Sequence, residues 1–165
     1  MASNSSFDIV SETSLEEVQN AVNQSMMEIR QRFDFKNSKS EITLDKGENQ
    51  MVLVSDDETK MNSVIDVLQG KLVRRKVSIN ALAYGKIELA SGGTVRQTVK
   101  IQQGIPPDKG KEIAKFIKGL GVKVQSQIMD KQVRITGKKK DDLQAVMASL
   151  REKDFGIDMS FTNYR

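Results

Sequence analysis

The sequence predicts an α+β fold made of two ferredoxin-like βαββαβ units, each a four-stranded antiparallel sheet with two helices on one face. The main observation is that a short alternating strand, an acidic turn and an amphipathic helix occur twice at one spacing. Gln50 and Gln132 begin the two strands, Met61 and Leu143 begin the apolar stripes of the two helices, and both pairs are 82 positions apart. Another strand and another helix precede each copy. Agreement across two kinds of periodicity favours duplication over chance.

The first unit opens with an alternating strand at 7–10, after which Ser14 and Glu17 form a capping box that begins a helix. The inward positions of this helix, at helical spacing, are Leu15, Val18, Val22, Met26 and Ile29. Two strands follow, one in which Ile42 and Leu44 alternate and one at 50–54. In the next helix the inward positions are Met61, Val64, Ile65 and Leu68.

The end of the first unit is marked by turn-forming residues. Residues 77–90 contain two short candidate strands around a turn at Tyr84-Gly85. The run Ser91-Gly92-Gly93-Thr94 is typical of a flexible connection, so we expect it to link the two units.

The second unit repeats the order. After a strand at 98–101, Pro106-Pro107-Asp108 begins a helix that Gly121 is placed to end. Its inward positions are Ile113, Phe116, Ile117 and Leu120. Strands at 122–128 and 132–136 lead into the last helix, whose inward positions are Leu143, Val146, Met147 and Leu150. A strand at 159–163 completes the unit.

Alternation along the strands places a set of polar side chains on the sheet face that the helices leave open. In the second unit this set consists of donors and cations without an acidic residue: Lys100, Gln102, Lys123, Gln125, Gln127, Arg134, Thr136, Thr162 and Tyr164. Phosphate oxygens and base edges accept hydrogen bonds from such groups. The alternatives are an ordinary solvated sheet face, or a face that packs on a partner.

A basic turn, Thr136 to Asp142, precedes the last helix. Its three lysines, 138–140, together with the free amide groups at a helix N-terminus, have the chemistry of a phosphate site. The alternative is a solvated turn in which Asp141 and Asp142 serve only to start the helix.

Charge is distributed unevenly along the chain. Residues 97–165 hold 14 Lys and Arg against 8 Asp and Glu, or +6, whereas residues 1–96 hold 12 against 14, or −2. A basic domain attracts polyanions, although lysine-rich surfaces also serve solubility.

Composition excludes several kinds of chemistry. The chain has no histidine and no cysteine, which removes the Ser-His-Asp and Cys-His arrangements and thiolate metal sites. Carboxylates remain as possible catalysts or Mg²⁺ ligands, but the densest group, Asp56-Asp57-Glu58, diverges around a helix start and is assigned to capping. We therefore expect no catalytic residue, no metal site and no cofactor. No apolar stretch approaches the roughly 20 residues of a membrane span, and the first residues lack the pattern of a signal peptide. We expect a cytoplasmic protein that does not enter membranes.

Several motifs in one order resemble the YajQ family of bacterial nucleotide-binding proteins. They are Ser6 to Glu12, Arg32 to Asn37, Gln103 to Ile105, and the stretch from Gln125 to Arg151. The resemblance implies two ferredoxin-like domains that exchange their N-terminal strands, with one domain at 14–103 and the other at 1–13 and 104–165. Without exchange the boundaries are 1–90 and 95–165. With exchange, the open face of the second unit loses Lys100 and Gln102 and gains Asp8.

The resemblance also implies a ligand. It points to a non-catalytic protein that binds a nucleotide or dinucleotide, in some members a cyclic guanine dinucleotide, and that changes contacts with nucleic acid or with a regulatory protein. We expect phosphate contacts from Arg134, Lys123, Lys138 and Lys139, and base or ribose contacts from Gln125, Gln127 and Tyr164. The alternatives are an RNA- or tRNA-binding protein, or one that binds DNA, and a protein-interaction module with covered sheet faces.

Overall fold

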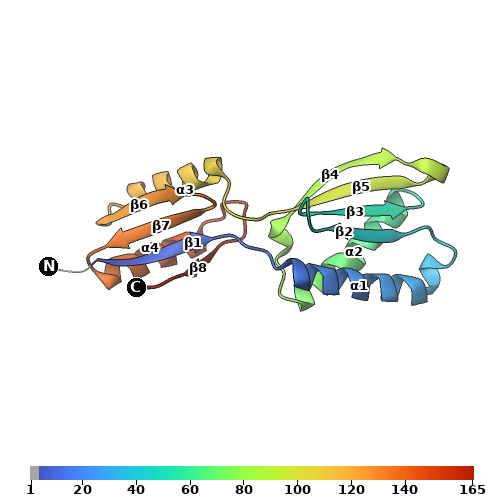
Figure 1. Cartoon of the computed structure of the whole chain (residues 1–165), viewed down its shortest axis with the longest axis horizontal. Helices are drawn as coiled ribbons and strands as arrows, with labels where there is room; N and C mark the ends of the chain where they lie inside the picture. Colours follow the sequence, from blue (N-terminus) through green and yellow to red (C-terminus); the bar gives the residue numbers. More distant parts are fainter. Residues whose placement is uncertain (1–3) are drawn as a thin grey trace. The chain divides into compact units, whose positions relative to one another are not determined.

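The computed structural model describes residues 4–165, which form two units (Figure 1). Unit 1 contains the described residues up to Glu12 together with Gln103–Arg165. Unit 2 is the continuous segment Thr13–Gln102. Each has a four-stranded sheet in which every pair of neighbouring strands is antiparallel. The predicted α+β architecture with two such sheets and four helices is confirmed.

Unit 1 has the sheet order β6-β7-β1-β8. Its elements are β1 (Ser5–Val10), α3 (Pro107–Gly119), β6 (Val124–Met129), β7 (Gln132–Gly137), α4 (Lys140–Glu152) and β8 (Ser160–Thr162). One apolar cluster joins alternate strand residues, such as Phe7, Ile9 and Ile135, to Ile113 of α3 and Val146 of α4. Both helices therefore cover the same face of the sheet, and the other face is left open.

Unit 2 has the sheet order β2-β3-β5-β4. Its elements are α1 (Leu15–Gln31), β2 (Glu41–Asp45), β3 (Gln50–Ser55), α2 (Glu58–Arg74), β4 (Leu82–Leu89) and β5 (Val95–Ile101), with short 3-10 turns at Phe33–Phe35, Ile79–Ala81 and Ser91–Gly93. Its core contains the inward residues that the helical spacing predicted, including Val18, Ile29, Met61 and Leu68.

In unit 1 the inner strand β1 comes from a distant part of the chain, whereas in unit 2 the inner strand β5 follows β4 directly. β1 pairs with β7 and β8 in unit 1, and β5 pairs with β3 and β4 in unit 2. Lys100 consequently lies opposite Gln50 in unit 2, and Gln102 also belongs to that unit. Neither residue lies on the open face of unit 1, where alternation without strand exchange had placed them.

Local signals explain where most helices begin and end. The Ser14 hydroxyl accepts a hydrogen bond from the Glu17 amide at 3.3 Å, and the Asp57 carboxylate accepts one from the Lys60 amide at 2.7 Å. Both are N-caps, and they fix the starts of α1 and α2. α3 begins at Pro107, and Gly121, with φ +70°, takes the left-handed conformation that follows a helix end.

Two expectations at the end of the first sequence repeat are wrong. Residues 82–89 form one strand, β4, whose register shifts between Tyr84 and Ile87, rather than two strands around a turn. The Ser91–Gly93 segment connects β4 to β5 within a single sheet, so it does not link the units. A glycine-rich hairpin connection and a glycine-rich linker have the same composition, which explains the error.

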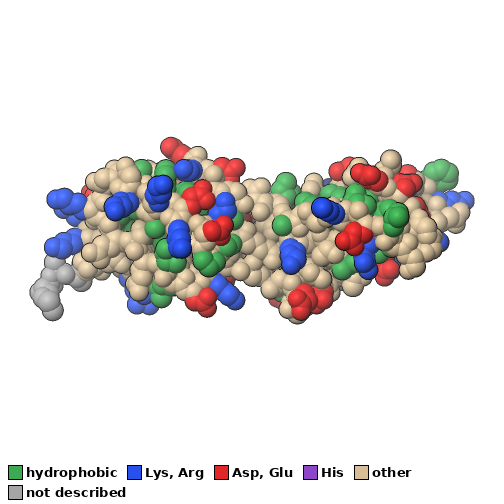
Figure 2. All heavy atoms as spheres, turned by 90° about the horizontal axis from the view of Figure 1, so that it is seen from above, with side chains coloured by type: hydrophobic (Ala, Val, Ile, Leu, Met, Phe, Trp, Pro, Cys, Tyr) green, Lys and Arg blue, Asp and Glu red, His purple; other side chains and the backbone are tan. Residues whose placement is uncertain are grey.

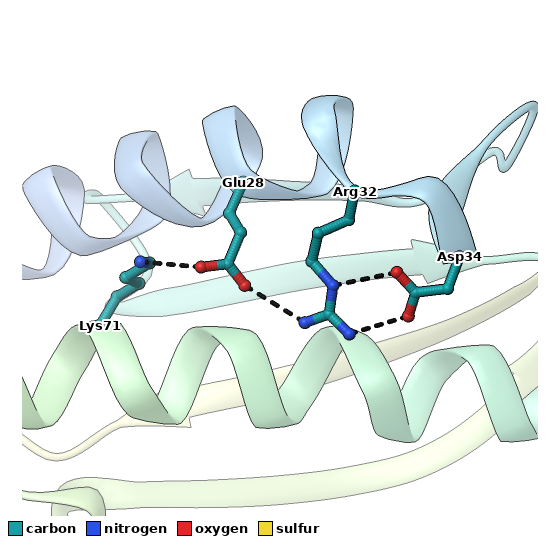
Figure 3. A network of polar contacts seen from close by, with 4 residues as sticks. All are labelled: Glu28, Arg32, Asp34 and Lys71. Atoms are coloured by element: carbon teal, nitrogen blue, oxygen red, sulfur yellow. Dashed lines mark hydrogen bonds and ion pairs between the residues drawn. The ribbon is translucent and has the colours of Figure 1, made fainter.

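A chain of ion pairs holds the segment that follows α1 (Figure 3). Lys71 of α2 contacts Glu28 at 3.0 Å, Glu28 contacts Arg32 at 3.2 Å, and Arg32 contacts Asp34 at 2.8 Å. The hydrogen bond from Lys71, followed by that from Arg32, lowers the pKa of the Glu28 carboxyl. These contacts give Arg32 and Asp34, from the stretch Arg32 to Asn37, a structural role at the end of α1.

Among the described residues, no helix has both the length and the apolar composition needed to cross a membrane.

Candidate functional site

A basic pocket lies at one end of the sheet of unit 1, where β6 begins, β7 ends and α4 starts. We call it the α4 pocket. Its volume is about 440 Å³, within the range of about 300–1,000 Å³ that is usual for small-molecule sites. It is lined by Asn4, Lys123, Val124, Gln125, Thr136, Gly137, Lys138, Lys139 and Asp142. Four of the seven residues that the sequence suggested for ligand contacts, Lys123, Gln125, Lys138 and Lys139, therefore share one cavity.

The charge of the α4 pocket is positive. Lys123, Lys138 and Lys139 face a single carboxylate, that of Asp142. Within the part of the chain that the structure describes, none of these three lysines forms an ion pair. Figure 2 shows Lys and Arg side chains gathered at the left end of unit 1, the end at which β6 begins and β7 ends in Figure 1. Unpaired lysines in a hollow attract an anion.

The start of α4 adds free backbone donors to the pocket. Lys139 is the N-cap residue, with extended backbone angles (φ −113°, ψ 130°), but its side chain cannot accept a hydrogen bond from the first turn. The first amide groups of α4 are left without a side-chain cap. They add the positive end of the helix dipole to the lysine charges.

The duplicated sequence provides a natural comparison for this helix start. Position by position, at the spacing of 82, Asp56, Asp57 and Glu58 of unit 2 correspond to Lys138, Lys139 and Lys140 of unit 1. α2 and α4 begin at corresponding residues, Glu58 and Lys140. In unit 2 the Asp57 side chain caps the helix, and Asp56 accepts hydrogen bonds from Ser38 and from the Lys39 amide. In unit 2 a side chain accepts a hydrogen bond from the first turn of the helix. In unit 1 the first turn has no side-chain cap, and three lysines occupy the corresponding positions.

The register of the strands places two of the remaining candidates on the open sheet face beside the pocket. Gln125 of β6 lies opposite Thr136 of β7, and one row further along, Gln127 lies opposite Arg134. Rows on one face of a strand are about 7 Å apart. Gln127 and Arg134 therefore neighbour the α4 pocket without lining it.

Arg134 is held by a buried carboxylate. Asp8 of β1 is 1% exposed and lies opposite Arg134 in the register. Arg134 donates from Nε to Asp8 Oδ1 at 2.8 Å and from Nη2 to Oδ2 at 3.3 Å, and Asn163 Nδ2 donates to Oδ2 at 2.9 Å. The hydrogen bond from Arg134, which outweighs burial, lowers the pKa of the Asp8 carboxyl. The open face thus has an acidic residue at its centre, and that residue neutralises its central cation.

Tyr164 lies on the opposite side from the one predicted. Asn163 has a left-handed backbone (φ 56°), and Arg165, rather than Tyr164, exchanges backbone hydrogen bonds with Ser6. The extra residue reverses the alternation, as a β-bulge does. The Tyr164 ring consequently stacks on the buried Phe7 ring on the helix-covered side, with centroids 6.4 Å apart, and its hydroxyl donates to Met147 Sδ.

Sequence reasoning missed the roles of two residues in this region. Alternation with strand exchange places Asp8 on the open face, between the inward residues Phe7 and Ile9, but it does not show that the carboxylate is buried and paired with Arg134. Asn163 is a residue type that tolerates the left-handed conformation, but one asparagine in a short strand does not predict a bulge. Among residues 4–165, no group of three acidic side chains is placed to hold a metal ion. The chemistry of the α4 pocket is that of an anion site.

Comparison with known proteins extends over the whole chain. The sequence profile of a family described as "Nucleotide-binding protein YajQ-like" matches residues 5–165. A protein of Desulfitobacterium hafniense is 58% identical over 165 residues, and one of Carboxydothermus hydrogenoformans is 56% identical over 165 residues. A protein of Bacillus cytotoxicus is 54% identical over 165 residues. Each comparison covers 100% of both chains, and all three relatives are named nucleotide-binding proteins.

Proposed function

Because the chain belongs to the family of YajQ-like nucleotide-binding proteins, we propose that it binds a nucleotide whose phosphate groups occupy the α4 pocket. Lys138 and Lys139 contact phosphate together with the first amide groups of α4, and Lys123 contacts it from the start of β6. Gln125, on the same wall, donates to ribose or base.

The observation that carries this proposal is the difference between the two duplicated helix starts. An N-cap contributes about 1 kcal/mol to stability, and unit 2 has one at Asp57. Unit 1 has Lys139 at the corresponding position, without a side-chain cap, and its first turn contains Asp141 and Asp142 beside the lysines. The carboxylates offset part of the lysine charge, but the first amide groups still have no side-chain acceptor at the cap position, and a bound anion would supply one. A phosphate group supplies both the acceptor atoms and the negative charge that are needed.

Arg134 has a different role in this proposal from the one that the sequence suggested. Two of its donor groups already bind Asp8, so we assign it to holding the sheet beside the pocket. Gln127, one row away, reaches a ligand that extends across the open face, such as a dinucleotide. A cyclic guanine dinucleotide is therefore one ligand to test beside mononucleotides.

We propose a receptor role without catalysis. The α4 pocket offers ammonium groups, amides and one carboxylate, and the sequence contains no histidine to act as a general base near neutral pH. Binding then changes contacts with nucleic acid or with a protein partner in the cytoplasm. Structured RNA as the direct ligand is the alternative. The pairing of Arg134 with Asp8 favours a small ligand, because it removes the central cation of the sheet face.

The test is a titration of the full chain with GTP and with a cyclic guanine dinucleotide by calorimetry. We expect the Lys138→Gln/Lys139→Gln double variant to lose most of the affinity of the wild type. The matched control is Lys111→Gln, which changes an exposed lysine of α3 outside the pocket lining. Equal affinities in all three proteins would exclude the α4 pocket as the phosphate site.

Salt dependence separates the two ligand classes. Affinity for a mononucleotide held by three lysines falls moderately with ionic strength. Affinity for RNA that contacts many phosphates falls much more steeply, because each neutralised phosphate releases counterions. A slope that corresponds to six or more phosphate contacts would overturn the small-ligand proposal in favour of RNA.

A further inference from the structure

A second, smaller cavity lies on the other side of the α4 start. Its volume is about 220 Å³, and it is lined by Ser5, Ser6, Lys140, Leu143, Gln144, Met147, Tyr164 and Arg165. This is below the range of about 300–1,000 Å³ for sites that enclose a whole ligand, so the cavity suits one ring system. We call it the Tyr164 cavity.

The two cavities are adjacent through shared segments of chain. Asn4 lines the α4 pocket and Ser5 lines the Tyr164 cavity. At the helix start, Lys139 lines the α4 pocket and the next residue, Lys140, lines the Tyr164 cavity. A ligand whose phosphate lies at the first turn of α4 therefore has the Tyr164 cavity within reach of its other end.

The wall of this cavity is a supported aromatic ring. Tyr164 is 60% exposed although one face of its ring stacks on the buried Phe7 ring, at an interplanar angle of 26°. Its hydroxyl donates to Met147 Sδ at 3.5 Å, which fixes the ring from a second direction. A ring that is held in place and accessible to solvent is the arrangement on which nucleobases stack.

The position of Tyr164 depends on the bulge at Asn163. The left-handed backbone of Asn163 is unfavourable for a residue with a side chain, and the hydrogen bond from its side chain to Asp8 Oδ2 offsets that cost. Asp8 is in turn held by Arg134. The half-exposed Arg134 and the buried Asp8 thus support the bulge that places Tyr164 on the helix-covered side.

Polar groups at the rim can distinguish a base from a plain ring. Gln144 of α4 is exposed, and its amide offers both a donor and an acceptor. Ser5, which shares a strand face with Phe7, supplies a further hydroxyl from β1.

We infer that the Tyr164 cavity is the nucleobase subsite of the nucleotide site, with the base stacked on Tyr164 and its edge hydrogen-bonded to Gln144. This inference rests on the proposed function, since it requires the phosphate to occupy the α4 pocket. It assigns the stacking of the base to Tyr164 on the helix-covered side, and it leaves Gln125 on the open face to contact ribose.

The experiment compares GTP with tripolyphosphate, which carries the phosphates without the base, on the full chain. Tyr164→Ala is expected to weaken GTP binding about tenfold, in keeping with the cost of losing one base–aromatic stack, and to leave tripolyphosphate binding unchanged. Tyr164→Phe keeps the ring and is expected to bind GTP about as well as the wild type. Gln144→Leu, at an exposed helical position where folding is not at stake, should weaken GTP binding alone.

The outcomes separate this inference from the proposal beneath it. If Lys139→Gln weakens binding of both compounds while Tyr164→Ala and Gln144→Leu change neither, the phosphate site stands and the base subsite is wrong. If Tyr164→Ala weakens both compounds equally, the ring has a structural role and the inference fails. Absence of binding by both compounds in the wild type would overturn both proposals.

Discussion

The substitution Lys139→Asp should raise stability and lower nucleotide affinity at the same time. It gives unit 1 the residue that unit 2 has at Asp57. Lys139 already has the extended backbone of an N-cap residue, so the new carboxylate needs no change of backbone to accept from the first turn of α4. The two expected effects have opposite signs, which distinguishes a binding role from a structural one.

The gain in stability can be estimated from the cap alone. A carboxylate in place of a residue that cannot cap a helix contributes about 1 kcal/mol, with a range of about 0.5–2. Repulsion from Asp141 and Asp142 in the first turn reduces this, while Lys138 and Lys140 on either side offset the reduction. For a unit of this size, about 1 kcal/mol raises the melting temperature by about 4–8 °C.

The loss of affinity follows from the change of two charge units at the pocket wall. One unit charge acting on another at 4 Å contributes about 1 kcal/mol in water-like surroundings. A change of two units therefore weakens binding of a phosphate group by about 2 kcal/mol, or about 30-fold. High salt should reduce this difference, since the α4 pocket is open to solvent.

The stability assay is amide hydrogen exchange of α4, which reports on unit 1 separately from unit 2. Calorimetry with GTP gives the affinity. The control Lys111→Asp makes the same charge change on α3, outside the pocket lining, and should alter neither quantity appreciably. If Lys139→Asp lowers stability and affinity together, Lys139 supports the fold and the reasoning from the missing cap is refuted.

Three further predictions concern residues outside the lysine cluster. Arg134→Leu should destabilise unit 1 more than Asp8→Asn at pH 7, because the carboxylate is buried and the guanidinium is 37% exposed. The wild-type pKa of Asp8 is lowered, so its ion pair stabilises the fold fully above the ordinary carboxyl pKa of 3.8, and this stabilisation is lost as the pH falls below that value. In urea unfolding, the stability difference between wild type and Arg134→Leu should therefore shrink as the pH falls below 3.8, and a constant difference would contradict this. Glu28→Gln should destabilise unit 2 by less than about 1 kcal/mol in urea unfolding, and by less still at 1 M salt, since the ion pairs are about one-third exposed. Gly121→Ala should lower stability by about 1 kcal/mol because φ is +70°, whereas Gly119→Ala, where an added Cβ meets no atom within 4 Å, should not.

The helices were predictable because their signals are local. The apolar stripe of α1, its cap at Ser14 and the glycine after α3 each involve residues within one or two turns of each other. The repeat at a spacing of 82 added a long-range signal, and it predicted two sheets of the same kind. Composition at Ser91-Gly92-Gly93-Thr94 predicted a flexible connection but not which elements it joins.

The site was predictable in part, for a physical reason. Lys123, Gln125, Lys138 and Lys139 come together because two adjacent strands and the following helix meet at one sheet end, which pairing of neighbouring strands predicts. The position of Tyr164 depends on a single left-handed residue, and the neutralisation of Arg134 depends on Asp8, which is 126 positions away in the sequence. Alternation carries no information about a one-residue bulge, and every side chain beyond it then changes face.

The two copies differ in a way that lets one unit carry the proposed binding site without losing its fold. The core of each unit is buried between helices and sheet and does not include the residues at the starts of α2 and α4. Exchanging a cap for a lysine there costs about 1 kcal/mol, a fraction of the stability of about 5–15 kcal/mol that a domain typically has. The helix start in unit 2 is capped by Asp57, whereas the one in unit 1 has Lys139 without a side-chain cap, where the proposal places an anion. Bound ligand should therefore stabilise α4 against exchange more than it stabilises α2, and equal protection of both helices would contradict a phosphate site in unit 1 alone.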